Sequence, residues 1–351
     1  MPRSLDAIAR FIATLPRLPL GVFPTPLVPL PRLSDQLGID LWLKRDECSG
    51  LALGGNKTRK LEFVLADARA RGCDTLVTIG PLTSNHTMMT AAAARRTGFK
   101  IHCIVGGVEP PPTTRSGNLL LLDYLGATLH FSPINYADPT EAEFEALTAL
   151  AERVVAATGG YWIPGGGTMP QAEPGYMNAI AEIAAQRGGR FDFDEIVVAY
   201  GTGSTTTGIL LGLALGGLGA RLQPVAVQSR RAVEEIFSRK TTTDLFLESS
   251  DHLGLGFTAA DVPPHEIVFG YADEGYGVPN AGSDAAIRLL ATTEGYFLDP
   301  VYTAKAFWGL TQLVAQGRIA KGRRVLFIHT GGLSMAPAGE KRFTTPLEVE
   351  H

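Results

Sequence analysis

Short apolar runs alternate with amphipathic stretches along most of the 351-residue chain. The apolar runs predict buried strands at residues 41–45, 75–79, 101–105, 127–131, 195–200, 223–228, 266–269 and 324–329. Apolar residues at helical spacing predict helices near the N-terminus, at residues 61–68, 86–96, 117–125, 141–158 and 175–186, and after residue 208. Strands and helices that alternate in this way indicate parallel sheets joined by right-handed crossovers.

A run of three glycines, Gly165–Gly167, divides this alternation into two series. We therefore predict an α/β fold with two lobes, in which a small α/β domain (49–161) is inserted into a larger domain (1–48 and 162–351). The length of the chain suits two domains or one large α/β unit. The proline-rich segment Pro16–Pro31 is predicted to be an extended arm, because proline disfavours regular helix.

Composition narrows the class of protein. Hydrophobic residues make up 45% of the chain and charged residues 19%, which indicates a compact globule. The net charge of −4 and the short basic runs disfavour nucleic acid as a partner. Three cysteines without CxxC spacing fit a reducing, cytoplasmic environment. We expect neither a signal peptide nor a membrane span, because no long apolar segment is present.

The segment Leu53–Lys60 places a lysine in a glycine-rich turn between a predicted strand and a predicted helix. Gly54 and Gly55 stand just before Lys57. Such a turn fixes the amine through the backbone, which suggests that the amine is needed at one point in space. A solvated surface lysine is the plain alternative. A nucleotide-binding loop of the Walker type is disfavoured, because the chain lacks the adjacent Gly-Lys pair of that motif.

The segment Gly201–Gly208 follows a predicted strand and begins a predicted helix. It carries a Ser and three Thr residues in succession between its glycines. Hydroxyl groups and free N–H groups at a helix N-terminus favour a phosphate. The segment is not GxGxxG, so a lone phosphate is favoured over a dinucleotide. The alternative is a threonine-rich turn that caps its own helix. A Schiff-base lysine beside a monophosphate site predicts pyridoxal 5′-phosphate as the cofactor.

Other candidates are weaker on their own. Ser84-Asn85-His86 begins an Ala-rich helix whose N–H groups suit a substrate carboxylate, or it is a plain N-cap. Thr330 follows the last predicted strand, where α/β folds place residues that face ligands. The seven histidines show no metal-binding spacing, so no catalytic metal is expected.

With these motifs in order, the chain resembles the D-cysteine desulfhydrase and 1-aminocyclopropane-1-carboxylate deaminase group of pyridoxal-phosphate enzymes, which has the tryptophan-synthase-β-like fold (fold type II). The resemblance covers nearly the whole chain and implies three-layer lobes and a homodimer. The matching segments are KRDE at Lys44, LALGGNKTRKLEF at Leu51, SNH at Ser84, GTGSTTTG at Gly201, GYGVPN at Gly275, LDPVYTAKA at Leu298 and LFIHTGG at Leu326.

The resemblance also implies a role for each candidate site residue. Lys57 would hold the cofactor covalently and act as the catalytic base. Further cofactor contacts are implied for Asn85, Thr202, Gly203, Ser204, Thr205, Thr303 and Thr330. Substrate contacts are implied for Thr83, Ser84, Asn85 and His86. Catalytic roles beside Lys57 are implied for Ser84, Tyr276 and Tyr302, although packing is the plainer reading of each tyrosine in isolation.

Two positions favour the desulfhydrases over the deaminases within this group. The deaminases carry Glu where this chain has Thr303, and Leu where it has Thr330. A carboxylate would keep the pyridine nitrogen protonated and make a strong electron sink, which helps to open a cyclopropane. A neutral hydroxyl gives a weaker sink that suffices for β-elimination. Thr83 and the Met88-Met89 pair depart from the usual pattern of the group, which bears on substrate identity.

The favoured hypothesis is a cytoplasmic β-eliminating lyase acting on a small amino acid, with D-cysteine desulfhydrase activity releasing sulfide, pyruvate and ammonia. L-cysteate sulfo-lyase is an alternative, but a sulfonate requires an extra cation that Met88-Met89 does not offer. 1-Aminocyclopropane-1-carboxylate deaminase is a second alternative. A nicotinamide-dependent dehydrogenase and a non-enzymatic small-molecule binding protein are alternatives from other classes.

Overall fold

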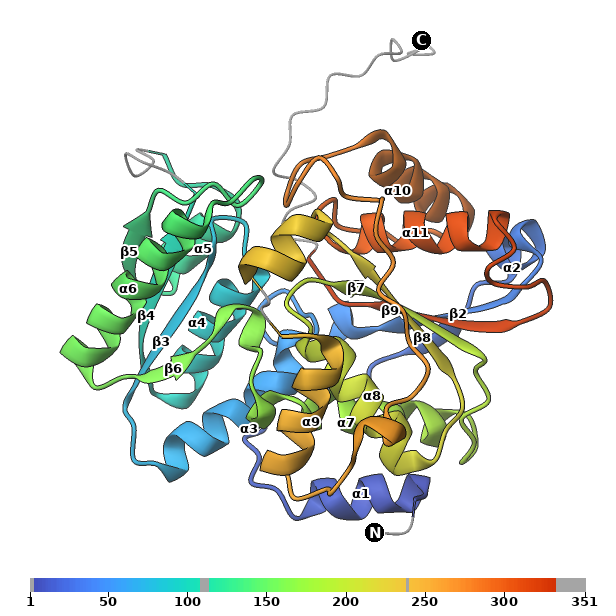
Figure 1. Ribbon diagram of the computed structural model, residues 1–351, viewed down its shortest axis with the longest axis horizontal. Coiled ribbons are helices and arrows are strands. Elements are labelled where there is room, and N and C mark those ends of the chain that lie inside the picture. Colours follow the sequence, from blue (N-terminus) through green and yellow to red (C-terminus); the bar gives the residue numbers. More distant parts are fainter. Residues whose placement is uncertain (1–2, 108–113, 238–239, 333–351) are drawn as a thin grey trace, which may run out of the picture.

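The computed structural model describes residues 3–107, 114–237 and 240–332. In this part of the chain, two α/β lobes lie side by side, and each is built on one sheet (Figure 1). Residues 333–351, which belong to the predicted larger domain, lie outside the described residues.

The larger lobe contains a five-stranded sheet in the order β1-β2-β9-β7-β8. Its strands are β1 (Leu27–Pro29), β2 (Asp40–Arg45), β7 (Glu195–Tyr200), β8 (Arg221–Ala226) and β9 (Arg324–His329). All neighbouring strands run parallel except β1 and β2, which pair antiparallel. The antiparallel edge comes from the proline-rich arm, which is extended as predicted but ends in this short strand and in α2 (Pro31–Leu37).

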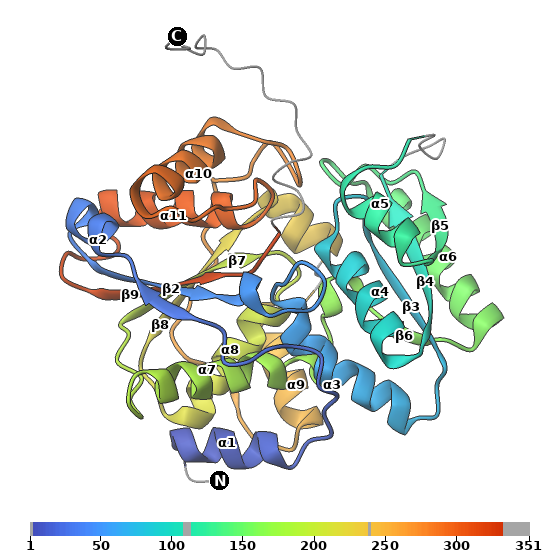
Figure 2. The ribbon, with the colours of Figure 1, turned by 180° about the vertical axis from the view of Figure 1, so that it is seen from behind.

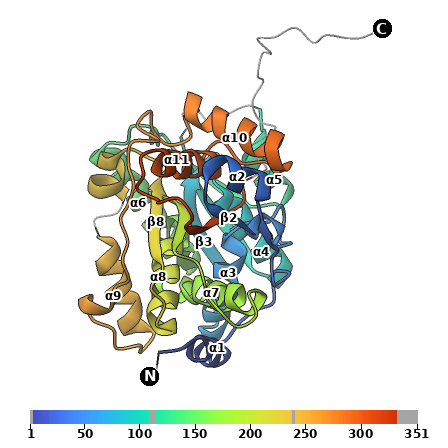
Figure 3. The same cartoon turned by 90° about the vertical axis from the view of Figure 1, so that its right-hand side faces the viewer.

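Helices cover both faces of this sheet. On one face, Ile196, Val198 and Leu326 pack with α1 (Leu5–Ala13), α7 (Pro174–Gln186) and α8 (Ser204–Gly216). On the other face, Val197 and Phe327 pack with α2, α10 (Ala281–Glu294) and α11 (Thr303–Ala315). Successive residues of a strand point to opposite faces, which explains why both cores are apolar. Figure 2 shows α1 beside α7, and Figure 3 shows α1 and α11 on opposite sides of the sheet.

The smaller lobe contains a parallel four-stranded sheet in the order β5-β4-β3-β6. Its strands are β3 (Thr75–Pro81), β4 (Lys100–Gly106), β5 (Thr128–Ser132) and β6 (Tyr161–Ile163). One face packs with α3 (Lys57–Ala70), α4 (Asn85–Thr97) and α5 (Gly117–Tyr124), and the other packs with α6 (Glu141–Thr158). Because β6 pairs with β3, this sheet extends two residues beyond the predicted domain boundary at 161.

The predicted strand at 266–269 is wrong. This segment makes only isolated bridges to β8, at Leu222–His265 and Val225–Val268. The physical reason lies in β8. Its Leu222 N–H donates to Pro264 O and its Ala226 N–H donates to Val268 O, but Pro224, which stands between them, has no N–H to donate. The predicted strand at 223–228 also begins and ends two residues earlier, at Arg221 and Ala226. The helices α2, α9 (Thr242–His252), α10 and α11 were not indicated by the apolar pattern.

Candidate active site

A cavity of about 510 Å³ is lined by residues of both lobes. Three of the segments that line it come directly after the carboxyl ends of parallel strands. Ser84 comes after β3, Thr202 after β7, and Thr330 after β9. Ligands of open α/β sheets bind at this edge, so the topology brings together residues that are far apart in the sequence.

The turn before Lys57 is fixed from two sides. The N–H of Asn56 donates to Thr330 O at 3.0 Å, and its side-chain Nδ2 donates to Thr205 Oγ1 at 3.0 Å. Gly54 has φ 75°, and a Cβ at this position would lie 1.7 Å from Glu47 O, so a side chain does not fit. These contacts hold Lys57, the first residue of α3, beside both the Gly201–Gly208 segment and the end of β9.

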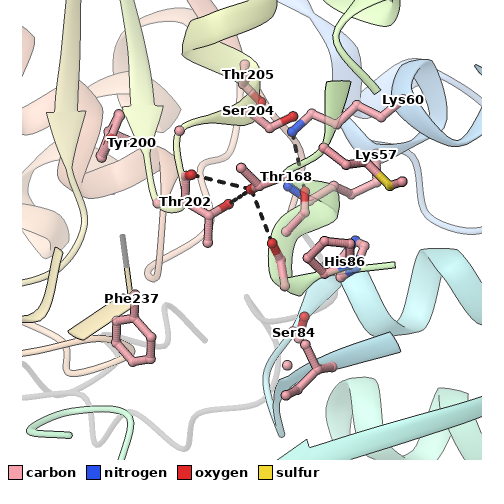
Figure 4. Close-up of a pocket in the computed structure, with 18 of the residues that line it drawn as sticks. Lys57, Lys60, Ser84, His86, Thr168, Tyr200, Thr202, Ser204, Thr205 and Phe237 are labelled. Atoms are coloured by element: carbon pink, nitrogen blue, oxygen red, sulfur yellow. Dashed lines mark hydrogen bonds between the residues drawn. The ribbon is translucent and has the colours of Figure 1, made fainter. Parts of the chain in front are cut away.

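The Gly201–Gly208 segment has the form of an anion cradle. Its middle glycine, Gly203, has φ 95° and stands as the N-cap of α8 without a side-chain cap. The N–H groups of the first helical turn therefore face the cavity without a capping side chain. Thr168 Oγ1 donates to Thr202 Oγ1 at 2.6 Å, which orders the entry to the cradle (Figure 4). Predicted cradle residues Thr202, Gly203, Ser204 and Thr205 all line the cavity.

The half-buried Lys57 lies next to this cradle together with the buried Lys60 and Glu173. Burial lowers the pKa of Lys57 well below its usual value, and the charge of Lys60 lowers it further. Burial also lowers the pKa of Lys60, to about 8, against the opposing charge of Glu173. Burial raises the pKa of Glu173 to about 8. The surroundings of Lys57 therefore favour its neutral amine over the ammonium ion, and the neutral amine is the nucleophilic and basic form.

The start of α4 forms the wall opposite the cradle. Ser84 is the N-cap of α4, and its Oγ accepts from Thr87 N at 3.2 Å. Asn85 accepts at Oδ1 from Asn118 Nδ2 at 2.9 Å. His86 is buried, and its Nε2 lies 2.8 Å from Thr78 Oγ1. Burial lowers the pKa of His86 well below its usual value, and Lys57 and Lys60 add to this effect. The imidazole ring is thus neutral, and its Nε2 atom is hydrogen-bonded to Thr78.

The two predicted tyrosines meet at the cavity wall. Tyr276 Oη and Tyr302 Oη lie 2.5 Å apart. Burial raises the pKa of Tyr276 to about 12, against hydrogen bonds to Tyr302 and Thr83 that lower it. Thr83 itself does not line the cavity, but its side chain is hydrogen-bonded to Tyr276, which does.

Thr303 also lies off the cavity wall. Its Oγ1 donates to Asp299 Oδ1 at 2.7 Å, and its N–H donates to the same oxygen at 2.8 Å. Asp299 Oδ2 accepts from Tyr302 N at 2.9 Å, so this cluster orients Tyr302 at the start of α11. Thr303 therefore contacts Asp299 rather than the cavity, whereas Thr330 lines the cavity.

The sequence reasoning missed Asn56, Lys60, Thr168 and Glu173, all of which line the cavity. Lys60 could have been found, because it stands three residues after Lys57 and shares its helix face. Glu173 carries no sequence signal, since it approaches the cradle only through the packing of α7 against α8.

Comparison with known proteins decides the class of enzyme. Residues 18–331 match the family model described as "Pyridoxal-phosphate dependent enzyme". The chain is a pyridoxal-phosphate-dependent enzyme. This result confirms the predicted cofactor and decides against the nicotinamide-dependent alternative.

Two relatives that are similar to this chain over nearly its whole length carry different enzyme names. D-cysteine desulfhydrase of Klebsiella pneumoniae (strain 342) is 38% identical over 341 residues, which cover 95% of this chain and 97% of the relative. A Pyrococcus horikoshii protein provisionally named 1-aminocyclopropane-1-carboxylate deaminase is 36% identical over 334 residues, which cover 93% and 95%. The resemblance to this group is thereby confirmed.

Solved structures confirm the fold. A crystal structure titled as an ACC deaminase homologue superimposes with a TM-score of 0.80 at 34% identity, covering 94% of this chain and 96% of that one. Threonine deaminase isoform 2 from Solanum lycopersicum superimposes with a TM-score of 0.65 at 17% identity, covering 95% and 86%. The latter likeness concerns the fold alone, which is that of fold type II.

The cavity residues fit pyridoxal phosphate. The cofactor needs a neutral amine for its aldehyde and a dianion site for its phosphate. Lys57, whose pKa is lowered, would supply the first, and the start of α8, which has no side-chain cap, would supply the second together with Lys60. Within the described residues, no group of three or more His, Cys, Asp or Glu could hold a metal ion. Among these residues there is also no helix of sufficient length and apolar character to cross a membrane.

Proposed function

We propose that this enzyme is a β-eliminating lyase that acts on a small amino acid with a sulfur leaving group, and that D-cysteine is the first substrate to test. The observation that carries the proposal is the position of Lys57, which is fixed between the phosphate cradle and the end of β9 and whose amine has its pKa lowered well below the usual value by burial. A base at this point can remove the proton from the substrate Cα without first losing one of its own.

The start of α4 is proposed to hold the substrate carboxylate. N–H groups of the first turn of a helix, together with the helix dipole, favour an anion. The Ser84 side chain caps this turn, and Asn118 fixes Asn85 from behind. This orientation would point the Cα–H bond of the substrate toward Lys57 on the facing wall.

The Tyr276–Tyr302 pair is proposed to serve the leaving group. Burial raises the pKa of Tyr302 well above its usual value, so its phenol stays protonated across the working pH range. A protonated phenol can donate to a departing thiolate, and Tyr276 can hold the orientation of that phenol through their 2.5 Å contact. Pyridoxal phosphate, when bound, would supply the electron sink for charge that develops at the substrate Cα.

Thr330 supports elimination over cyclopropane opening. It lines the cavity at the end of β9, where the resemblance implies a contact with the pyridine nitrogen, and its hydroxyl carries no charge. The names of the Pyrococcus relative and the solved homologue keep deaminase activity as the second candidate.

The test is a substrate panel with the purified holoenzyme. D-cysteine should yield pyruvate, ammonia and sulfide in equal amounts. L-cysteine tests chirality, L-cysteate tests sulfite release, and 1-aminocyclopropane-1-carboxylate tests release of 2-oxobutyrate. Release of 2-oxobutyrate as the dominant activity, without pyruvate from any β-substituted amino acid, would contradict the proposal.

A further inference from the structure

The cavity has two chemically different halves. The half described above is polar and holds the lysines, the cradle and the start of α4. The other half is apolar and is formed by Tyr136, Phe144, Leu147, Trp162, Ile236 and Phe237. We call these six residues the apolar wall. They come from the loop after β5, from α6 and β6, and from the π-helix Ala232–Phe237 of the larger lobe.

Aromatic rings form a continuous row from the tyrosine pair to this wall. Tyr276 contacts Tyr302 and Tyr136, with ring centroids 5.7 and 6.1 Å apart. Tyr136 stacks on Phe237 at 5.6 Å, and Phe144 meets the same ring edge-on at 5.6 Å. The row therefore begins where the proposed leaving group departs and includes rings of both lobes.

The apolar wall lies between the reaction centre and the solvent. Thr148, Lys240 and Glu248 also line the cavity and are exposed, so the cavity opens between α6 and α9. Lys240 Nζ and Glu248 Oε2 form an ion pair at 2.5 Å, which balances the charge at this opening. Figure 4 shows Phe237 on the opposite side of the drawn site from Lys57 and Lys60.

A free cysteine has no group that reaches this wall. In the proposed binding mode its side chain would end at the sulfur, next to the tyrosine pair. The four aromatic rings of the wall are only partly buried. Small-molecule sites are usually lined by apolar and aromatic side chains that match an apolar part of the ligand. A substituent on the sulfur would extend along the ring row toward the opening and cover those rings.

We infer that the apolar wall is a subsite for the sulfur substituent of cysteine thioethers, so that S-aryl and S-aralkyl cysteines are the preferred substrate class. This inference rests on the proposed β-elimination. It predicts that activity rises, rather than falls, as the sulfur substituent becomes larger and more aromatic.

The reaction balances without an oxidant or reductant. Lys57 takes the Cα proton, the Cβ–S bond breaks, and sulfur leaves with the bonding electrons and gains a proton to become the free thiol. The remaining aminoacrylate tautomerises to an imine, which water hydrolyses. The sum is one thioether and one water giving one thiol, one pyruvate and one ammonium ion.

The experiment measures kcat/KM of the holoenzyme for cysteine, S-methylcysteine and S-benzylcysteine of the same configuration, with both configurations tried. Released thiol and pyruvate are assayed separately. We expect kcat/KM for S-benzylcysteine to exceed that for cysteine by about tenfold or more. A steady fall in kcat/KM from cysteine to S-benzylcysteine would overturn the inference while leaving the proposed function intact.

A variant locates the effect. Phe237→Ala should lower kcat/KM about tenfold more for S-benzylcysteine than for cysteine. Phe297→Ala is the matched control, since Phe297 is 62% exposed and does not line the cavity. This variant should leave kcat/KM unchanged for both substrates. An equal effect of Phe237→Ala on both substrates would contradict the subsite. If wild-type holoenzyme released pyruvate from none of these compounds, the proposed function and the inference would both fail.

Discussion

The first turns of α3 contribute to two buried charge clusters that behave in opposite ways. Arg59 is 2% exposed and faces Asp46 and Glu182, while Lys57 and Lys60 face the cavity. The guanidinium of Arg59 donates to Asp46 at 2.8 and 2.9 Å and to Glu182 at the same distances. Asp46 also accepts from Tyr176 Oη at 2.6 Å.

The two clusters differ in the number of oppositely charged partners that each charged group has. Burial raises the pKa of Asp46, but the charge and hydrogen bonds of Arg59 outweigh it and lower that pKa below its usual value. In the Lys57 cluster burial prevails instead, lowering the pKa of both lysines and raising that of Glu173. A fully paired cluster stabilises the fold, whereas an under-compensated one is ready to exchange protons.

Lys57→Ala should produce the largest effect. Loss of the proposed base and covalent anchor should lower kcat at least about 10³-fold. The fold should survive, because the Arg59 cluster is untouched. Steady-state pyruvate release by the reconstituted variant measures this effect, and Lys100→Ala, at an exposed lysine paired with Asp74, is the control. Near-normal turnover by Lys57→Ala would show that another group acts as the base.

Arg59→Met should act on stability. It removes the guanidinium from two buried carboxylates, so that Asp46 keeps only hydroxyl donors and Glu182 keeps Lys44, which should cost about 3–5 kcal/mol of unfolding free energy. Urea unfolding of the holoenzyme at neutral pH measures this loss. Arg230→Met, which breaks an exposed pair with Glu234, should change stability by about 0.5 kcal/mol or less. An equal loss of unfolding free energy in the two variants would contradict the difference that we draw between buried and exposed ion pairs.

Lys60→Met should act on cofactor affinity. Lys60 Nζ lies 3.4 Å from Gly166 O, and Gly166 abuts Thr202 of the cradle. Loss of this cation beside a bound phosphate should raise the Kd of pyridoxal phosphate by about ten- to a hundredfold. Spectroscopic titration of the apoenzyme measures the Kd, with stability expected to change less than in Arg59→Met. An unchanged Kd would place the phosphate away from Lys60.

Glu173→Gln should produce the smallest change, a shift in pH dependence. The carboxyl gains its charge as the pH rises through about 8, and that charge raises the pKa of Lys60. Without it, Lys60 loses its proton at lower pH. Cofactor affinity, measured from pH 6 to 10, should therefore decline at a lower pH in the variant than in the wild-type protein. A shift of this decline to higher pH would contradict the assigned charges.

Elements could be predicted from the sequence where the residues within and next to them determine where they begin and end. The strand at Glu195–Tyr200 and the helix at Glu141–Thr158 have the predicted ends, because turn and cap residues bound them. The segment at 266–269 could not be judged from its own residues, since its ladder is interrupted by Pro224 in another strand. Prediction of the site was limited in the same way, by contacts between segments that are far apart in the sequence. Lys57 and the cradle are local motifs, while Glu173 reaches the cavity only through helix packing.

The central claim is that Lys57, rather than its neighbour Lys60, holds the cofactor. Reduction of the holoenzyme with borohydride, followed by proteolysis and mass spectrometry, locates the lysine that carries the cofactor. We predict the phosphopyridoxyl group on Lys57, with Lys60 unmodified. Attachment to Lys60, or an absence of any attached cofactor in a fully reconstituted protein, would contradict the account.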